Sequence, residues 1–147
     1  MSRFPTSRRP RSGASAAEFA LILPVFLLLL ITVMDFGWLF FQRATLDMAA
    51  TVGCRAGSLQ DPGDGDANLA LVQDVAAEAM KIELIRAGAG DCGDGCYTDV
   101  YAYGDPPGRS IVCIVGRDIE PLVGLAVEPM TLESSIAMRL EWQRWPE

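Results

Sequence analysis

The residues best suited to chemistry in this chain are four cysteines, Cys54, Cys92, Cys96 and Cys113. The sequence contains no histidine, which excludes Ser-His-Asp and Cys-His nucleophilic centres and every His-ligated metal site. Carboxylates are numerous, but no feature of the sequence marks two of them as a pair placed for acid–base catalysis. The sequence therefore predicts a protein that is not an enzyme and that carries no metal or other cofactor.

The even number of cysteines predicts disulfides if the region that carries them is exported. In an oxidising compartment four cysteines form two disulfides, for which three connectivities exist. Cys92 and Cys96 are close enough in a glycine-containing loop to pair, which leaves Cys54 for Cys113. A zinc site made of all four cysteines is an alternative, but their spacing lacks the C-x2-C element and zinc thiolates suit a reducing compartment. Acidic residues in the loop 61–68 suggest calcium as another alternative, although the EF-hand spacing is not met.

Composition and charge exclude further classes of protein. Hydrophobic residues make up 50% of the 147, which is too many for an intrinsically disordered chain and enough for one modest core. The net charge is −7, and the part that follows Phe41 holds 8 basic and 17 acidic residues, a net charge of −9. A region that acidic is not expected to bind nucleic acid.

A hydrophobic stretch near the N-terminus places this acidic region relative to a membrane. From Phe19 to Phe41 the only charge is Asp35, and a helix of that length spans a hydrocarbon core of about 30 Å at about 1.5 Å per residue. Asp35 is expected near the far boundary, where its carboxylate reaches headgroups or water. Four arginines precede the helix, so the positive-inside rule places the N-terminus in the cytoplasm and the acidic region outside.

The junction between the basic leader and the apolar helix carries a second pattern. Gly13 ends the basic stretch, small residues follow, and a lone Glu18 precedes Phe19 at the edge of the apolar run. This pattern resembles a prepilin peptidase site cleaved after Gly13, with Ala14 as the new N-terminus and Glu18 as its fifth residue. The small residues suit an extended stretch that threads a protease. A cleaved secretory signal and a plain single-span anchor are the alternatives, and the first is disfavoured because the apolar run is longer than such signals use.

The resemblance extends further along the chain. The stretch AAEFALILP, the segment Asp35-Phe36-Gly37 late in the apolar helix and the closing segment TLESSIAMRLE resemble the TadE-like family. Members of that family are minor pilins or pseudopilins of tight-adherence (Tad) pili, a kind of type IV pilus. The similarity covers residues 13–58 and 111–141. It implies insertion in the bacterial inner membrane, removal of the leader by a prepilin peptidase, and joining of a pilus or pilus-initiating complex used for adherence.

The chain is therefore expected to divide into a leader (1–13), a transmembrane helix (14–41) and an exported domain (42–147). The helix is expected to continue to about Ser58, and Ala49, Gly53 and Gly57 recur in it at every fourth position. A face of such small residues allows another backbone to approach closely. Two partners remain open for this face, namely the protein's own sheet and a helix of a neighbouring subunit.

The remainder of the exported domain has a mixed pattern. The spacing predicts a second helix over residues 67–87. Its expected apolar stripe comprises Val72, Val75, Ala79 and Ile82. Strands are expected over residues 97–103, 110–116 and 131–142, the last with strict alternation of apolar and polar residues. The predicted fold class is α+β and pilin-like: a long N-terminal helix, a second helix, and a roughly three-stranded, mainly antiparallel sheet packed on both.

The sequence thus favours a non-enzymatic, TadE-like minor pilin or pseudopilin. Its expected partners are the inner membrane, a prepilin peptidase, other Tad pilins and the assembly machinery. The alternative is an uncleaved, single-span assembly or surface-binding factor. Glu18 is expected to act in assembly by pairing with the α-amine of Ala14 on its own or a neighbouring chain, whereas the simpler interpretation is that it caps the helix N-terminus. Further residues expected at assembly contacts are Asp35, Ala49, Gly53 and Gly57.

Overall fold

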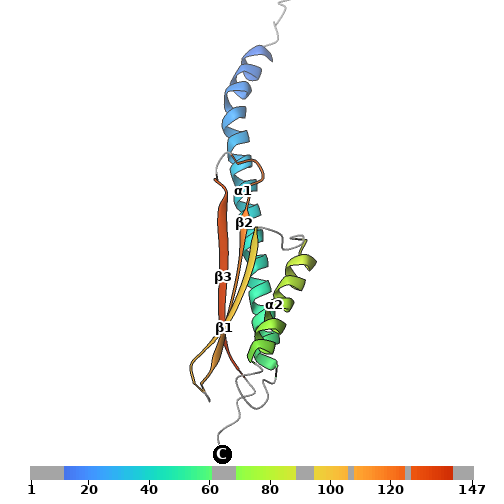
Figure 1. Ribbon diagram of the computed structural model, residues 1–147. Coiled ribbons are helices and arrows are strands. Elements are labelled where there is room, and N and C mark those ends of the chain that lie inside the picture. Colours follow the sequence, from blue (N-terminus) through green and yellow to red (C-terminus); the bar gives the residue numbers. More distant parts are fainter. Residues whose placement is uncertain (1–11, 61–68, 89–94, 106–107, 125–126, 141–147) are drawn as a thin grey trace, which may run out of the picture.

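The computed structural model describes residues 12–60, 69–88, 95–105, 108–124 and 127–140. In chain order its elements are α1 (Ser12–Leu59), α2 (Leu69–Arg86), β1 (Cys96–Tyr103), β2 (Ser110–Ile119) and β3 (Met130–Arg139). Figure 1 shows that the N-terminal half of α1 projects away from the rest, whereas its C-terminal half lies alongside α2 and the sheet. The predicted α+β class is confirmed.

Helix α1 is continuous over 48 residues, with Pro24 inside it. Its apolar side chains up to residue 34 are largely exposed, with Leu21 at 79% as the extreme. In the C-terminal half, Leu46, Ala49 and Ala50 are instead buried in the core. This half owes its burial to α2 on one face and to β2 and β3 on another.

Helix α2 confirms the predicted second helix but not the predicted face. The buried residues on α2 are Val72, Ala76, Met80 and Leu84, each four positions after the last. Of the predicted stripe, Val75 and Ala79 are only half-buried and Ile82 is 46% exposed. The prediction failed because apolar residues surround α2 on several sides, so their spacing alone does not choose the face that packs on α1.

The sheet is antiparallel with the strand order β1-β2-β3, so β2 is central. On β2, Ile111, Cys113 and Val115 are fully buried and belong to the same core as the buried residues of α1 and α2. The alternation predicted for the last strand is confirmed over the described residues, because Ser134 is buried and Leu132 and Ile136 are half-buried between exposed neighbours. Strand β2 extends to Ile119, beyond the predicted end at residue 116.

Candidate functional site

The predicted processing site lies at the beginning of α1. The helix begins at Ser12, so Gly13 and Ala14 are in its first turn. Alanine has the highest helix propensity of any residue, which favours a helix over the alanines that follow Gly13. The extended conformation expected while this stretch threads a protease stays a prediction. A peptidase that cut after Gly13 would have to unwind this first turn. Terminal turns unwind more readily than turns inside a helix. The basic residues 3–11 of the leader lie outside the described residues.

Glu18 and Phe19 follow on the free part of the helix, and both are exposed. Glu18 lies beyond the first turn of α1, which contains no acidic residue. Removal of residues up to Gly13 would make Glu18 the fifth residue of the helix instead of the seventh. The partial positive charge of the helix N-terminus would then act on its carboxylate from closer by.

Asp35 occupies an unexpected environment. Its side chain has 0% exposure, so the expectation that it reaches headgroups or water was wrong. The backbone N–H of Val123, in the connection between β2 and β3, donates a hydrogen bond of 3.0 Å to Asp35 Oδ1. Among the described residues, Asp35 Oδ2 is buried without a hydrogen-bond partner. A buried carboxylate in an apolar segment needs a hydrogen-bond donor. Here the donor comes from a loop that is distant in the sequence.

The small residues of α1 are used inside the chain. A Cβ atom at Gly53 would lie 2.1 Å from Met80 Cγ and 2.8 Å from the backbone oxygen of Ala76, both on α2. Gly57 likewise faces α2, and Ala49 has no exposed surface. Of the two partners left open by the sequence, the sheet contributes Ile111 on β2, whose Cδ1 would lie 3.0 Å from a Cβ atom at Gly57. A contact of this face with a neighbouring subunit stays a prediction. The second helix of the same chain, which was not among those partners, packs closely against Gly53 and Gly57.

The next face of α1 is joined covalently to the sheet. Cys54 and Cys113 form a disulfide with a Cα–Cα distance of 5.6 Å across a sequence separation of 59. This is the same pair that the spacing favoured. Cys96 is also disulfide-bonded, whereas Cys92 lies outside the described residues, so the Cys92–Cys96 pairing stays a prediction.

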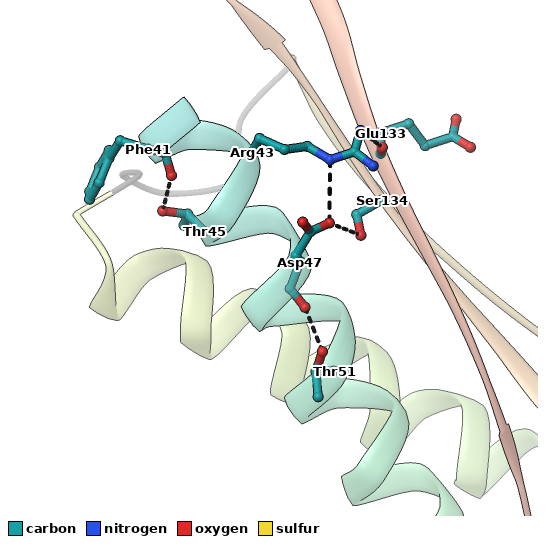
Figure 2. A network of polar contacts seen from close by, with 7 residues as sticks. All are labelled: Phe41, Arg43, Thr45, Asp47, Thr51, Glu133 and Ser134. Atoms are coloured by element: carbon teal, nitrogen blue, oxygen red, sulfur yellow. Dashed lines mark hydrogen bonds and ion pairs between the residues drawn. The ribbon is translucent and has the colours of Figure 1, made fainter. Parts of the chain in front are cut away.

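A polar network that was not predicted from the sequence ties α1 to the edge strand β3 (Figure 2). Asp47 Oδ1 accepts a hydrogen bond of 2.6 Å from Ser134 Oγ and lies 3.4 Å from Arg43 Nε. Arg43 Nη1 donates to the backbone oxygen of Glu133 at 2.7 Å. The spacing of Arg43 and Asp47, four apart on a helix, was the signal that could have revealed their ion pair.

The outer face of the sheet carries a second polar contact. Tyr97 on β1, Gly116 on β2 and Glu133 on β3 lie side by side in the strand register. The Tyr97 ring crosses β2 where Gly116 has no side chain, and its hydroxyl donates to the Glu133 carboxylate. This hydrogen bond, together with the negative charges of Glu133 and Asp118, raises the pKa of Tyr97 above its usual value.

The described residues show no cluster of three or more Cys, Asp or Glu side chains that could hold a metal ion. The loop 61–68, for which calcium was considered, lies outside the described residues. What the described part of the chain offers is a long apolar surface on α1, attached to a small domain by a disulfide and by close helix packing.

These features define an α+β protein in which, among the described residues, α1 is a candidate membrane span. The family model described as TadE-like protein matches residues 13–55, which is most of α1. The match confirms the predicted resemblance: over this segment the chain is similar to TadE-like proteins, a similarity that suggests involvement with Tad pili. No curated protein and no solved structure matches the chain.

Proposed function

We propose that the chain is a minor pilin or pseudopilin that takes part in the assembly or initiation of a Tad pilus used for adherence. The observation that carries this proposal is the TadE-like match over residues 13–55, a segment that includes Gly13, Glu18 and the apolar half of α1. A structural, non-enzymatic role fits a chain that lacks histidine. In this proposal α1 crosses the inner membrane with its N-terminus in the cytoplasm, and the residues from 42 onward are periplasmic or lie in the pilus.

The exposed half of α1 is the surface through which the protein would join other pilins. Lipid covers such a surface in the membrane, and a filament must cover it with the helices of other subunits. Glu18 then requires a cationic partner, because leaving an ion desolvated and unpaired costs several kcal/mol. Removal of the leader by a prepilin peptidase creates that partner, the α-amine of Ala14, on the same chain or a neighbouring one.

The mass of the N-terminus tests the proposal directly. In cells with a working prepilin peptidase, the intact mass of the membrane-extracted protein should correspond to a chain that begins at Ala14. Without the peptidase, or with Gly13 replaced by leucine, the leader should stay attached. A chain that keeps residues 1–13 in the presence of the peptidase would contradict the pilin role and favour the alternative of an uncleaved, single-span assembly or surface-binding factor.

The variant Glu18→Gln separates assembly from folding. Glutamine keeps the size of the side chain and removes its charge, so insertion and cleavage should proceed at near-normal levels. Co-purification with the other pilins should fall at least tenfold, because the register between helices would lose its ion pair. If Glu18→Gln captured its partners and supported piliation as well as the original chain, Glu18 would only cap the helix.

A further inference from the structure

The connection between β2 and β3 reaches α1 inside its apolar run. Figure 1 shows it at the end of the sheet that faces the free half of α1. The contact is specific, because the Val123 N–H donates to the fully buried Asp35 Oδ1 at 3.0 Å. This hydrogen bond holds Val123 beside Asp35, 88 positions earlier in the sequence, so the connection lies at the level of Asp35 along the axis of α1.

That level lies within a membrane crossed by α1. Asp35 lies sixteen positions after Phe19, the first residue of the apolar run, which is a rise of about 24 Å along the helix at about 1.5 Å per residue. The hydrocarbon core is about 30 Å thick. If Phe19 lies at the inner boundary, Asp35 lies several ångströms short of the outer one, and so does the backbone of Val123.

The chemistry of this connection suits that depth. We call residues 121–124 the tip. Its side chains carry no charge, and Leu122 and Val123 are 58% and 48% exposed although both are apolar. Gly124 adopts a φ of 69°, which L side chains rarely tolerate, and so turns the chain at the end of the tip. Glu120 and Glu128, both exposed, flank the tip on its two sides.

We propose that the tip inserts into the outer leaflet of the membrane that α1 crosses, with Asp35 as its tether. Leu122 and Val123 enter the acyl-chain region, while Glu120 and Glu128 remain at the headgroups. The continuity of the tip with the apolar surface of α1 is what selects phospholipid as the occupant. The inference rests on α1 as a membrane span and not on any role in a pilus.

Insertion is measurable by tryptophan quenching in vesicles. The full chain, with Trp38, Trp142 and Trp145 replaced by phenylalanine, receives one tryptophan through Leu122→Trp. It is reconstituted into vesicles of phosphatidylcholine and phosphatidylglycerol, in which part of the phosphatidylcholine carries bromine on its acyl chains. In the same background, Leu28→Trp reports on the span itself, and Tyr103→Trp, at the opposite end of the sheet, reports on water.

The tryptophan at position 122 should be quenched at least half as strongly as the one at position 28, whereas the one at position 103 should not be quenched. Strong quenching at position 28 with none at position 122 would overturn the proposal and leave the span intact. Quenching at neither position would overturn the span, and with it the membrane anchoring in the proposed function. Emission at position 122 that shifts to the blue only as protein concentration rises, without bromine quenching, would overturn insertion and assign the tip to a neighbouring subunit instead.

The tether is tested with two variants of Asp35. Asparagine retains a carbonyl oxygen that accepts the Val123 N–H, whereas leucine retains none. Combined with Leu122→Trp, Asp35→Leu should lower quenching at least twofold and Asp35→Asn should leave it unchanged. Quenching in the Leu28→Trp chain should be unaffected by both. Retention of the Cys54–Cys113 disulfide serves as the check that the domain is folded. Equal quenching at position 122 with leucine and with aspartate at position 35 would overturn the role of Asp35.

Discussion

The two halves of α1 are built for opposite surroundings. In the N-terminal half, taken here as the part up to Phe41, most large apolar side chains are exposed, and Gly37 has no neighbouring atom within 4 Å of where a Cβ would lie. In the C-terminal half the residues in contact are small, and Gly53 and Gly57 have α2 pressed against them. One continuous helix therefore passes from a lipid-facing or pilin-facing surface to the central element of a folded domain.

The contrast shows which contacts stabilise each half of the helix. Large side chains without intrachain partners leave the N-terminal half dependent on lipid or on other subunits. Small side chains let backbones approach, so the C-terminal half obtains its stability from close packing and from the covalent link at Cys54. Changes in the second half should therefore unfold the domain, whereas changes in the first should alter partners and leave the domain folded.

The largest expected effect comes from the disulfide of the C-terminal half. Replacing Cys54 and Cys113 together by alanine opens a loop with a sequence separation of 59 and should lower the free energy of unfolding by about 4 kcal/mol. Denaturant unfolding of the full chain in detergent micelles, followed by near-UV circular dichroism, measures this loss. The far-UV signal of the membrane half should persist beyond the transition.

The matched control is the double variant Cys92→Ala and Cys96→Ala. If these two cysteines pair, as predicted, they close a loop of only a few residues, and their loss should cost clearly less because loop-closure entropy grows with loop length. Equal losses for the two double variants would mean that the Cys54–Cys113 bridge is not the principal link between α1 and the sheet.

Sequence patterns predicted best those parts whose surroundings are uniform. The apolar run from Phe19 onward was recognisable because lipid imposes the same requirement on every side of a helix. The alternation around Ser134 in β3 was recognisable because one face of that strand meets the core and the other meets water. The small residues Gly53 and Gly57 predicted that another backbone approaches α1 closely, but they did not predict which element it belongs to.

The features that escaped prediction depend on contacts between distant segments. The buried face of α2 runs through Ala76 and Met80 because those residues meet Gly53 and Gly57, a fit that spacing within α2 does not encode. The environment of Asp35 depends on a backbone N–H 88 positions away. In both cases a residue on α1 is complementary to a segment whose location only the fold determines.

The next largest effect on stability is expected from a glycine-to-alanine substitution, made separately in each half of α1. Gly53→Ala places a methyl group against Met80 and the backbone oxygen of Ala76, and should lower the free energy of unfolding by about 1–3 kcal/mol. Gly37→Ala meets nothing and should be neutral or should stabilise the helix by up to about 1 kcal/mol. Denaturant midpoints of the two full-length variants in the same detergent give the comparison. Matching midpoints would show that α2 does not press on α1 at Gly53.

The smallest effect concerns Glu133, where the polar contacts of α1 meet the outer face of the sheet. Its backbone oxygen accepts from Arg43 and its carboxylate accepts from Tyr97. Because that second bond, with nearby negative charge, raises the pKa of Tyr97 above about 10, folding favours the protonated phenol. The stabilisation is therefore complete below the pKa of an unfolded tyrosine and is lost as the pH rises through the higher pKa of the folded state.

An absorbance titration of tyrosinate near 295 nm in the full chain should show one of the three tyrosines ionising at higher pH than the others. The late step should disappear in Tyr97→Phe. In Glu133→Gln it should move to lower pH, because the phenol loses both its charged acceptor and the adjacent negative charge. Stability at neutral pH should change little in either variant, since the contact is exposed. If the late step survived Tyr97→Phe, it would belong to another tyrosine. The contact of Tyr97 with Glu133 would then not explain the late ionisation.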